Sequence, residues 1–179
     1  MSNLRQREIL VERILKERDH FEQLVNRVGY MRRMTLKGVV GTWSVKDTLA
    51  YLWAHEQYLA DRLYEILHDQ PYTPCKSQSA LDVFLDEFGY PDFGSPLLEA
   101  DAAGEWVVER HRHVSLDDLG AQEIEAFCSI ISALESMKES TLSRHNNLYQ
   151  HVIKHTCERY REFARPMRRW LNANGVQKK

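Results

Sequence analysis

Apolar residues recur at helical spacing along most of the chain. Near the start they lie three or four positions apart among Arg, Glu and Lys: Leu4, Ile9, Leu10, Ile14, Phe21, Leu24, Val25 and Val28. The same spacing returns over residues 45–67, 115–138 and 147–172. Because about 3.6 residues make one helical turn, such positions share one face, and that face can cover a core. The pattern therefore predicts four long helices, the first over residues 3–28.

The second predicted helix has a well-marked beginning. Ser44 is a good N-cap because its hydroxyl can accept a hydrogen bond from a free amide, and Asp47 places a carboxylate where the helix dipole favours it. The apolar stripe then continues through Val45, Leu49, Leu52, Leu59, Leu63 and Ile66. At about 100° per residue, Glu56 falls near the middle of this stripe and His55 roughly 80° from it. An acid that points inwards needs a partner.

Glycines and prolines mark the connections between these helices. The first connection, residues 30–42, is short, which implies antiparallel neighbours. The second runs from 68 to 114 and carries a short amphipathic stretch, 81–88, followed by a run rich in Gly and Pro. Connections of this length often cover a site. A proline in the last helix, Pro166, is expected to kink its final turns.

These elements predict an all-α protein. We expect a single-domain four-helix bundle over residues 1–174, with a long crossover between helices two and three. A chain of 179 residues is long enough for one such domain and too short for two comfortable ones. Residues 175–179 are expected to form a disordered tail.

Composition bears on the partners and the cellular compartment to be expected. The formal net charge is -2, and this balance does not favour a nucleic-acid partner. The three cysteines form neither a CxxC pair nor a disulfide framework, so reduced thiols are expected. There is no apolar signal segment and no run long enough to cross a bilayer, so we expect a cytoplasmic protein that makes no membrane contact.

Two short motifs resemble those of a known family. The first reads Trp-Ser-x-Lys-Asp-x-Leu-Ala and spans 43–50; the second reads His-Thr-Cys-Glu-Arg-Tyr-Arg-Glu and spans 155–162. Together they resemble the DinB/YfiT-like superfamily of four-helix proteins, and within it the ClbS/DfsB branch. The likeness extends over about residues 5–172. It implies a polar site inside a helical bundle that handles reactive small molecules.

A divalent metal, zinc or nickel, is one possible occupant of that site. His151 and His155 are four residues apart, so both imidazoles can reach one ion, and His55 is the candidate third ligand. The resemblance implies a different set, one His on the second helix and an HxxxH pair on the last. Those positions are Tyr51, His155 and Arg159 here, so one of the three expected ligands is kept. The family's metal pattern is degenerate in this chain.

The favoured alternative is a polar pocket without metal. Glu56, Tyr51, His55, His155 and Arg159 would form it between the second and fourth helices, and Arg159, expected to lie closer to the core than His155, could pair with Glu56. A carboxylate desolvated among apolar residues can act as a general base, with His55 or His155 as its proton partner and Tyr51 as a hydrogen-bond donor. A carboxylate paired with Arg159 would instead have only a structural role.

Two classes of function follow from these alternatives. The resemblance implies a small-molecule hydrolase or transferase that acts on an electrophile, with Glu56 and His155 as catalytic residues and Tyr51, His55 and Arg159 as binding residues. The competing class is a non-catalytic small-molecule-binding or stress-associated protein, either a monomer or a homodimer, that kept the fold and lost the metal. The departures from the family pattern at Tyr51 and Arg159 favour this second class.

Overall fold

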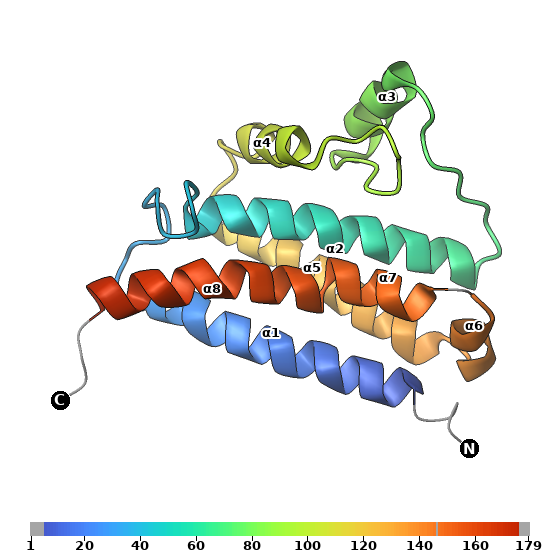
Figure 1. Ribbon diagram of the computed structural model, residues 1–179, viewed down its shortest axis with the longest axis horizontal. Helices are drawn as coiled ribbons and strands as arrows, with labels where there is room; N and C mark the ends of the chain where they lie inside the picture. The colour runs from blue at the N-terminus through green and yellow to red at the C-terminus, as the bar shows by residue number, and fades with distance from the viewer. Residues whose placement is uncertain (1–5, 146, 176–179) are drawn as a thin grey trace. The chain divides into compact units, whose positions relative to one another are not determined.

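The computed structural model describes residues 6–145 and 147–175, and the regular structure in those ranges is helical (Figure 1). The predicted all-α class is therefore confirmed. None of the helices in the described ranges is long and apolar enough to cross a membrane. The chain separates into two compact units, Met1–Thr48 with Lys138–Lys179, and Leu49–Met137. The single-domain bundle stays a prediction, and of the predicted tail, residues 176–179 lie outside the described ranges.

The first unit contains α1 (Gln6–Tyr30), α6 (Glu139–Arg144), α7 (Leu148–His155) and α8 (Cys157–Asn174). Within it, α1 and α8 lie side by side (Figure 1). They run in the same direction, because Glu17 pairs with Arg161 at 3.4 Å near the start of α8, and the end of α8 at Gly175 approaches Arg27 near the end of α1. Their buried side chains include Leu10, Ile14, Phe21, Tyr160, Phe163 and Met167. The apolar faces that the sequence periodicity predicts for these two helices are therefore buried.

The fourth predicted helix is broken in two. At Thr156 the backbone has φ −120° and ψ −88°, which separates α7 from α8. The hydroxyl of Thr156 donates to the carbonyl of Val152 at 2.7 Å, so the side chain competes for a group that the helix would use. Pro166, where a kink was expected, lies inside α8 without ending it. The stripe predicted across this point is nevertheless buried on both sides of the break, at Val152, Thr156 and Tyr160.

The start of α2 (Val45–Leu67) follows the predicted cap. The amide of Asp47 donates to Ser44 Oγ at 3.0 Å, and Asp47 Oδ2 accepts from the amide of Ser44 at 2.9 Å. Lys37 Nζ also bonds to Asp47 Oδ2. These reciprocal bonds satisfy two amides at the helix N-terminus, which is the arrangement of a capping box.

The second unit contains the rest of α2 with α3 (Gln78–Phe88), α4 (Ala100–Arg110) and α5 (Leu116–Ser136). The predicted cap of α5 is confirmed, because Ser115 Oγ accepts from the amide of Asp118 at 3.1 Å. The helix α4 was not predicted. Its buried residues are Ala103, Gly104 and Val107, which are too small and too few to stand out as an apolar stripe.

The cap of α2 predicts a pH-dependent stability. Burial alone would raise the pKa of Asp47, but the hydrogen bonds from Lys37 and Ser44 outweigh burial and hold this pKa below its ordinary value of 3.8. A carboxylate of this kind stabilises the fold above its unfolded pKa, and the stabilisation is lost as the pH falls through the folded value. In urea unfolding, Asp47→Asn should therefore be less stable than wild type at pH 7, and this difference in stability should shrink progressively as the pH is lowered below 3.8.

The control for this test is Asp19→Asn, which removes an exposed carboxylate of α1 that accepts from Gln23. The difference in unfolding free energy between Asp19→Asn and wild type should be small at both neutral and acid pH. A gap for Asp47→Asn that is equally large at neutral and acid pH would contradict this account of the cap.

Candidate functional site

A row of polar and aromatic side chains follows one face of α2 in the second unit. Tyr51, His55, Tyr58 and Arg62 are spaced by four, three and four residues, so they lie one above another on the helix. Phe93, from the segment after α3, lies against this row. Its ring stacks on His55 with centroids 3.9 Å apart and an angle of 17°, and it meets Tyr58 edge-on at 5.5 Å. Tyr51 adds an edge-on contact to His55 at 4.7 Å.

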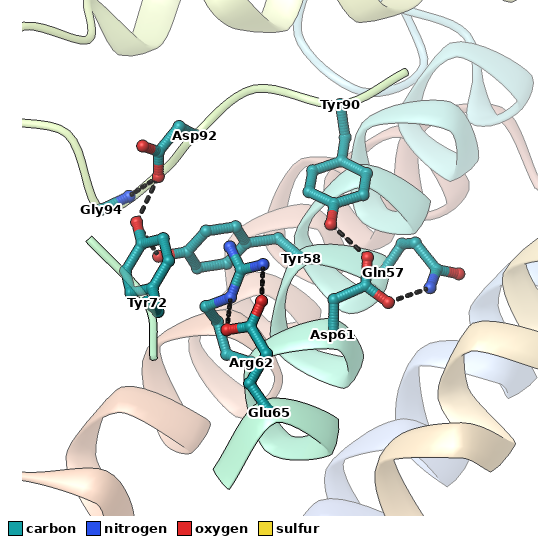
Figure 2. A network of polar contacts seen from close by, with 9 residues as sticks. All are labelled: Gln57, Tyr58, Asp61, Arg62, Glu65, Tyr72, Tyr90, Asp92 and Gly94. Atoms are coloured by element: carbon teal, nitrogen blue, oxygen red, sulfur yellow. Dashed lines mark hydrogen bonds and ion pairs between the residues drawn. The ribbon is translucent and has the colours of Figure 1, made fainter. Parts of the chain in front are cut away.

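The segment that carries Phe93 is held by the buried carboxylate of Asp92. Asp92 accepts hydrogen bonds from the hydroxyl of Tyr72, from the amide of Cys75 at 2.8 Å and from the amide of Gly94 at 3.1 Å. Figure 2 shows the bonds to Tyr72 and Gly94. Ser95 adds a bond from its hydroxyl to the carbonyl of Cys75 at 2.6 Å. One acid thus ties the loop after α2 to the loop after α3, and we call residues 89–97 the strap.

The tyrosines of this network stay protonated and act as donors. The Tyr58 hydroxyl donates a hydrogen bond to the Tyr72 hydroxyl at 3.1 Å, and the Tyr72 hydroxyl in turn donates one to Asp92 (Figure 2). Burial raises the pKa of both phenols, and the bond to Asp92 raises that of Tyr72 further. Burial and the nearby Asp92 also raise the pKa of the Cys75 thiol to about 11. This cysteine is therefore a poor nucleophile at neutral pH.

Gly94 is required where the strap passes these phenols. A Cβ on Gly94 would lie 2.6 Å from the Tyr58 hydroxyl and 3.2 Å from Tyr72 Cζ, and nearer still to the Tyr72 hydroxyl. Real Cβ atoms do not approach other atoms so closely, so a side chain here would push the strap or the rings apart.

Arg62 closes the row as a buried cation. Its side chain is 7% exposed, and two of its nitrogens bond to the Glu65 carboxylate at 2.8 and 2.6 Å. Burial alone would lower the pKa of Arg62, but the bond with Glu65 outweighs it and raises that pKa. The guanidinium also lies over the ring of Tyr72 at 4.2 Å and that of Tyr58 at 5.0 Å. A guanidinium paired and stacked in this way orients both tyrosines.

A second acid on α2 holds the beginning of the strap. Asp61 accepts from the hydroxyl of Tyr90, and its other oxygen accepts from Gln57 Nε2 at 3.0 Å (Figure 2). Burial and the bond to Asp61 raise the pKa of Tyr90. Tyr90 also meets the ring of Trp53 edge-on at 6.1 Å. The strap is therefore fastened to α2 at both Tyr90 and Phe93.

The predicted site residues of α2 are all buried. Glu56 is 0% exposed, His55 4% and Tyr51 8%. Tyr51 and His55 belong to the row under the strap, while Glu56 follows His55 directly and points to a different side of the helix. Sequence periodicity placed Glu56 inside the protein, and its burial agrees with that placement. The chemical roles of the three residues stay predictions.

The other predicted site residues belong to the first unit. His155 is fully buried at the end of α7, and its ring meets that of His151 edge-on at 4.8 Å. Arg159, expected to lie closer to the core than His155, is in fact the more exposed of the two, with 21% of its side chain accessible. It pairs with Glu162 at 2.8 Å and lies 3.8 Å from Glu158, both on its own helix.

The metal prediction stays open. Within residues 6–145 and 147–175, no group of three or more His, Cys, Asp or Glu side chains is placed to hold a metal ion. His151 and His155 belong to the first unit and His55 to the second, so the predicted triad draws on both.

Sequence reasoning missed the residues that hold the strap. Tyr72 bonds to Asp92, and Arg62 lies over the ring of Tyr72, yet none of these three residues stands in a recognisable motif. The available signal was the run of Gly and Pro around Asp92, which marked the segment as irregular without indicating its partners. Comparison of the chain with protein-family models, with curated proteins and with solved structures finds no match.

The close approach at Gly94 predicts a coupled pair of substitutions. Gly94→Ala should destabilise the protein by about 1 to 3 kcal/mol, because the new methyl group overlaps the two phenols. In Tyr72→Phe the nearest obstacle is gone, so the added cost of Gly94→Ala should fall by about 1 kcal/mol in a double-mutant cycle.

The measurement is urea unfolding of the four proteins of the cycle. Gly120→Ala is the control, because a Cβ on Gly120 in α5 meets nothing within 4 Å and should be tolerated. Additive effects of the two substitutions would show that the strap does not lie against Tyr72.

Proposed function

We propose that this chain is a small-molecule hydrolase or transferase of the DinB/ClbS-like type, which acts on a reactive electrophile at a polar site inside a helical bundle. The proposal includes the finer architecture: a single-domain bundle of four long helices, α1, α2, α5 and the interrupted α7 with α8, in which α3 and α4 form the crossover. The motif over residues 43–50 supports it, because Ser44 and Asp47 of that motif make the capping box that begins α2.

One observation carries the proposed chemistry: the side chain of Glu56 is fully buried in the middle of α2. Removing a carboxylate from water costs several kcal/mol, so a chain that keeps an acid there gains something from it, either in structure or in function. In the proposal Glu56 is the general base that activates water or a thiol. An electrophile with a strained ring or an activated ester needs no more than such a nucleophile and a donor for the leaving group.

The surroundings of Glu56 on its own unit fit this role. His55, next to it in the sequence, is 4% exposed and is shielded from water by the stacked ring of Phe93. A shielded imidazole can take and return a proton without competition from bulk water. Tyr51 lies against the same imidazole and supplies a phenol donor. His155 and Arg159 keep the roles predicted for them from the sequence, as the second catalytic residue and a binding residue.

The test of this proposal is Glu56→Gln, which keeps the shape of the side chain and removes the base. Wild-type protein should turn over at least one of three probes: 4-nitrophenyl acetate, styrene oxide, or 1-chloro-2,4-dinitrobenzene with a thiol. Glu56→Gln should lower that rate by about 100-fold or more, the usual contribution of a general base, while the circular dichroism spectrum is retained. The control is Glu123→Gln, which changes another buried acid, on α5. Full activity in Glu56→Gln would remove Glu56 as the base.

A non-catalytic binding protein is the second candidate, and the state of Arg159 favours it. This arginine stands where the resembling family has a metal-binding His, and its guanidinium is engaged by Glu162 and Glu158. A stress-associated protein that binds small molecules, as a monomer or a homodimer, would need neither a metal nor a base. A probe that raises the melting temperature of the protein without being consumed would support this candidate over the enzyme.

A further inference from the structure

The small net charge of the chain conceals two opposite charges. The first unit, residues 1–48 and 138–179, holds 20 of the chain's 24 Lys and Arg but 9 of its 26 Asp and Glu. The second unit, residues 49–137, holds the remaining 4 basic and 17 acidic residues. The expectation of no nucleic-acid partner rested on the sum of these charges. Since a partner meets a local surface, the charge of each unit is the relevant quantity.

Within the first unit, the charges are also divided along the helices. The acids of α1 end at Glu22 and those of α8 end at Glu162. Beyond them, residues 23–46 and 163–175 contain no Asp or Glu. Because α1 and α8 run in the same direction, their acid-free parts come together at one end of the pair, which Figure 1 shows as the end where α8 finishes.

Six exposed arginines occupy this end, and we call them the basic end: Arg27, Arg32, Arg33, Arg165, Arg168 and Arg169. Arg32 and Arg33 lie in the turn that follows α1 directly, where the amide of Arg33 donates to the carbonyl of Val28 at 3.3 Å. Arg165, Arg168 and Arg169 share one face of α8 by their spacing of three and one. A Cβ on Gly175, just beyond α8, would lie 4.0 Å from Arg27 Nη2, so the end of α8 lies close to Arg27 of α1.

Several other arginines of the unit have carboxylate partners. Arg18 pairs with Glu22 at 2.7 Å, Arg159 with Glu162 at 2.8 Å and Arg161 with Glu17 at 3.4 Å. In the part of the chain that the structure describes, none of the six arginines of the basic end makes an ion pair. Six like charges without counter-ions repel one another, so an anionic partner would lower the free energy of this surface.

We propose that the basic end binds the phosphate backbone of single-stranded nucleic acid, without preference for base sequence. Guanidinium groups fit phosphates as bidentate donors, and each phosphate contact releases a condensed counter-ion. Tyr30 stands among the arginines with its side chain 88% exposed, and such a ring can stack on an unpaired base.

A membrane fits this surface less well. Lasting attachment to anionic lipid takes apolar side chains as well as charge. Among the described residues of the turn and helix ends, the large apolar side chains that are exposed are Tyr30 and Leu36, the latter at 43%. Binding to nucleic acid needs the charges alone, and these are present.

The experiment is fluorescence anisotropy of the full chain with a labelled 20-nucleotide oligothymidylate, titrated at about 50 and about 200 mM salt. Six phosphate contacts predict a slope of log K against log salt of about −4, and therefore a loss of about 300-fold in affinity over this range. The triple variant Arg165→Gln, Arg168→Gln, Arg169→Gln should show a slope of about −2 and a loss of about 20-fold.

A matched control removes three positive charges from elsewhere in the same unit. Arg13→Gln, Lys16→Gln, Lys154→Gln changes three exposed residues outside the basic end, and should keep most of the affinity and the steep slope. Equal effects of the two triple variants would overturn the proposal, because the binding would then follow total charge. Binding of phosphatidylserine vesicles or of polyglutamate as tightly as the oligonucleotide would overturn it as well. So would a salt-sensitive dimer in sedimentation with no oligonucleotide bound, since the basic end would then meet the acidic unit of a second copy.

Discussion

The second unit depends on the satisfaction of one buried carboxylate. Asp92 is fully buried, and a buried acid without hydrogen bonds would cost several kcal/mol. Its partners come from three points of the chain: the side chain of Tyr72, the amide of Cys75 and the amide of Gly94. All three hydrogen bonds to Asp92 form when the loop after α2 lies against the strap. That requirement, rather than any regular element, brings these two irregular segments together.

The chemistry proposed for α2 depends on this closure. When the strap is in place, Phe93 covers His55 and Tyr72 stacks on Arg62, so polar groups of α2 are kept from water by aromatic rings. Glu56 is buried on the same helix, next to that row. An imidazole and a carboxylate that water does not reach are stronger hydrogen-bonding and proton-transfer groups than the same groups at a surface. The basic end lies in the other unit, so the proposed chemistry and the proposed binding of a polyanion use different parts of the chain.

Much of the helical framework could be predicted from the sequence because its causes are local. Periodicity and the caps at Ser44 and Ser115 fix where α2 and α5 begin, since both effects act within one or two turns. The break at Thr156 was missed, because a threonine inside an apolar stripe is common and its hydroxyl bond to the i−4 carbonyl leaves no distinctive pattern.

The network under the strap could not be predicted, for a different reason. Asp92 bonds to Tyr72 and Cys75, which are 20 and 17 residues away, across a stretch that contains α3. Pairings at this distance depend on how loops close, and neither periodicity nor capping constrains that closure. The burial of Glu56 was predictable from its place in the stripe.

The most direct measurement of the central claim is hydrogen exchange at the amides of Cys75 and Gly94, which lie outside the helices and whose protection depends on Asp92. The account predicts that both amides exchange slowly in wild-type protein and rapidly in Asp92→Ala. Rapid exchange of both amides in the wild type would contradict it.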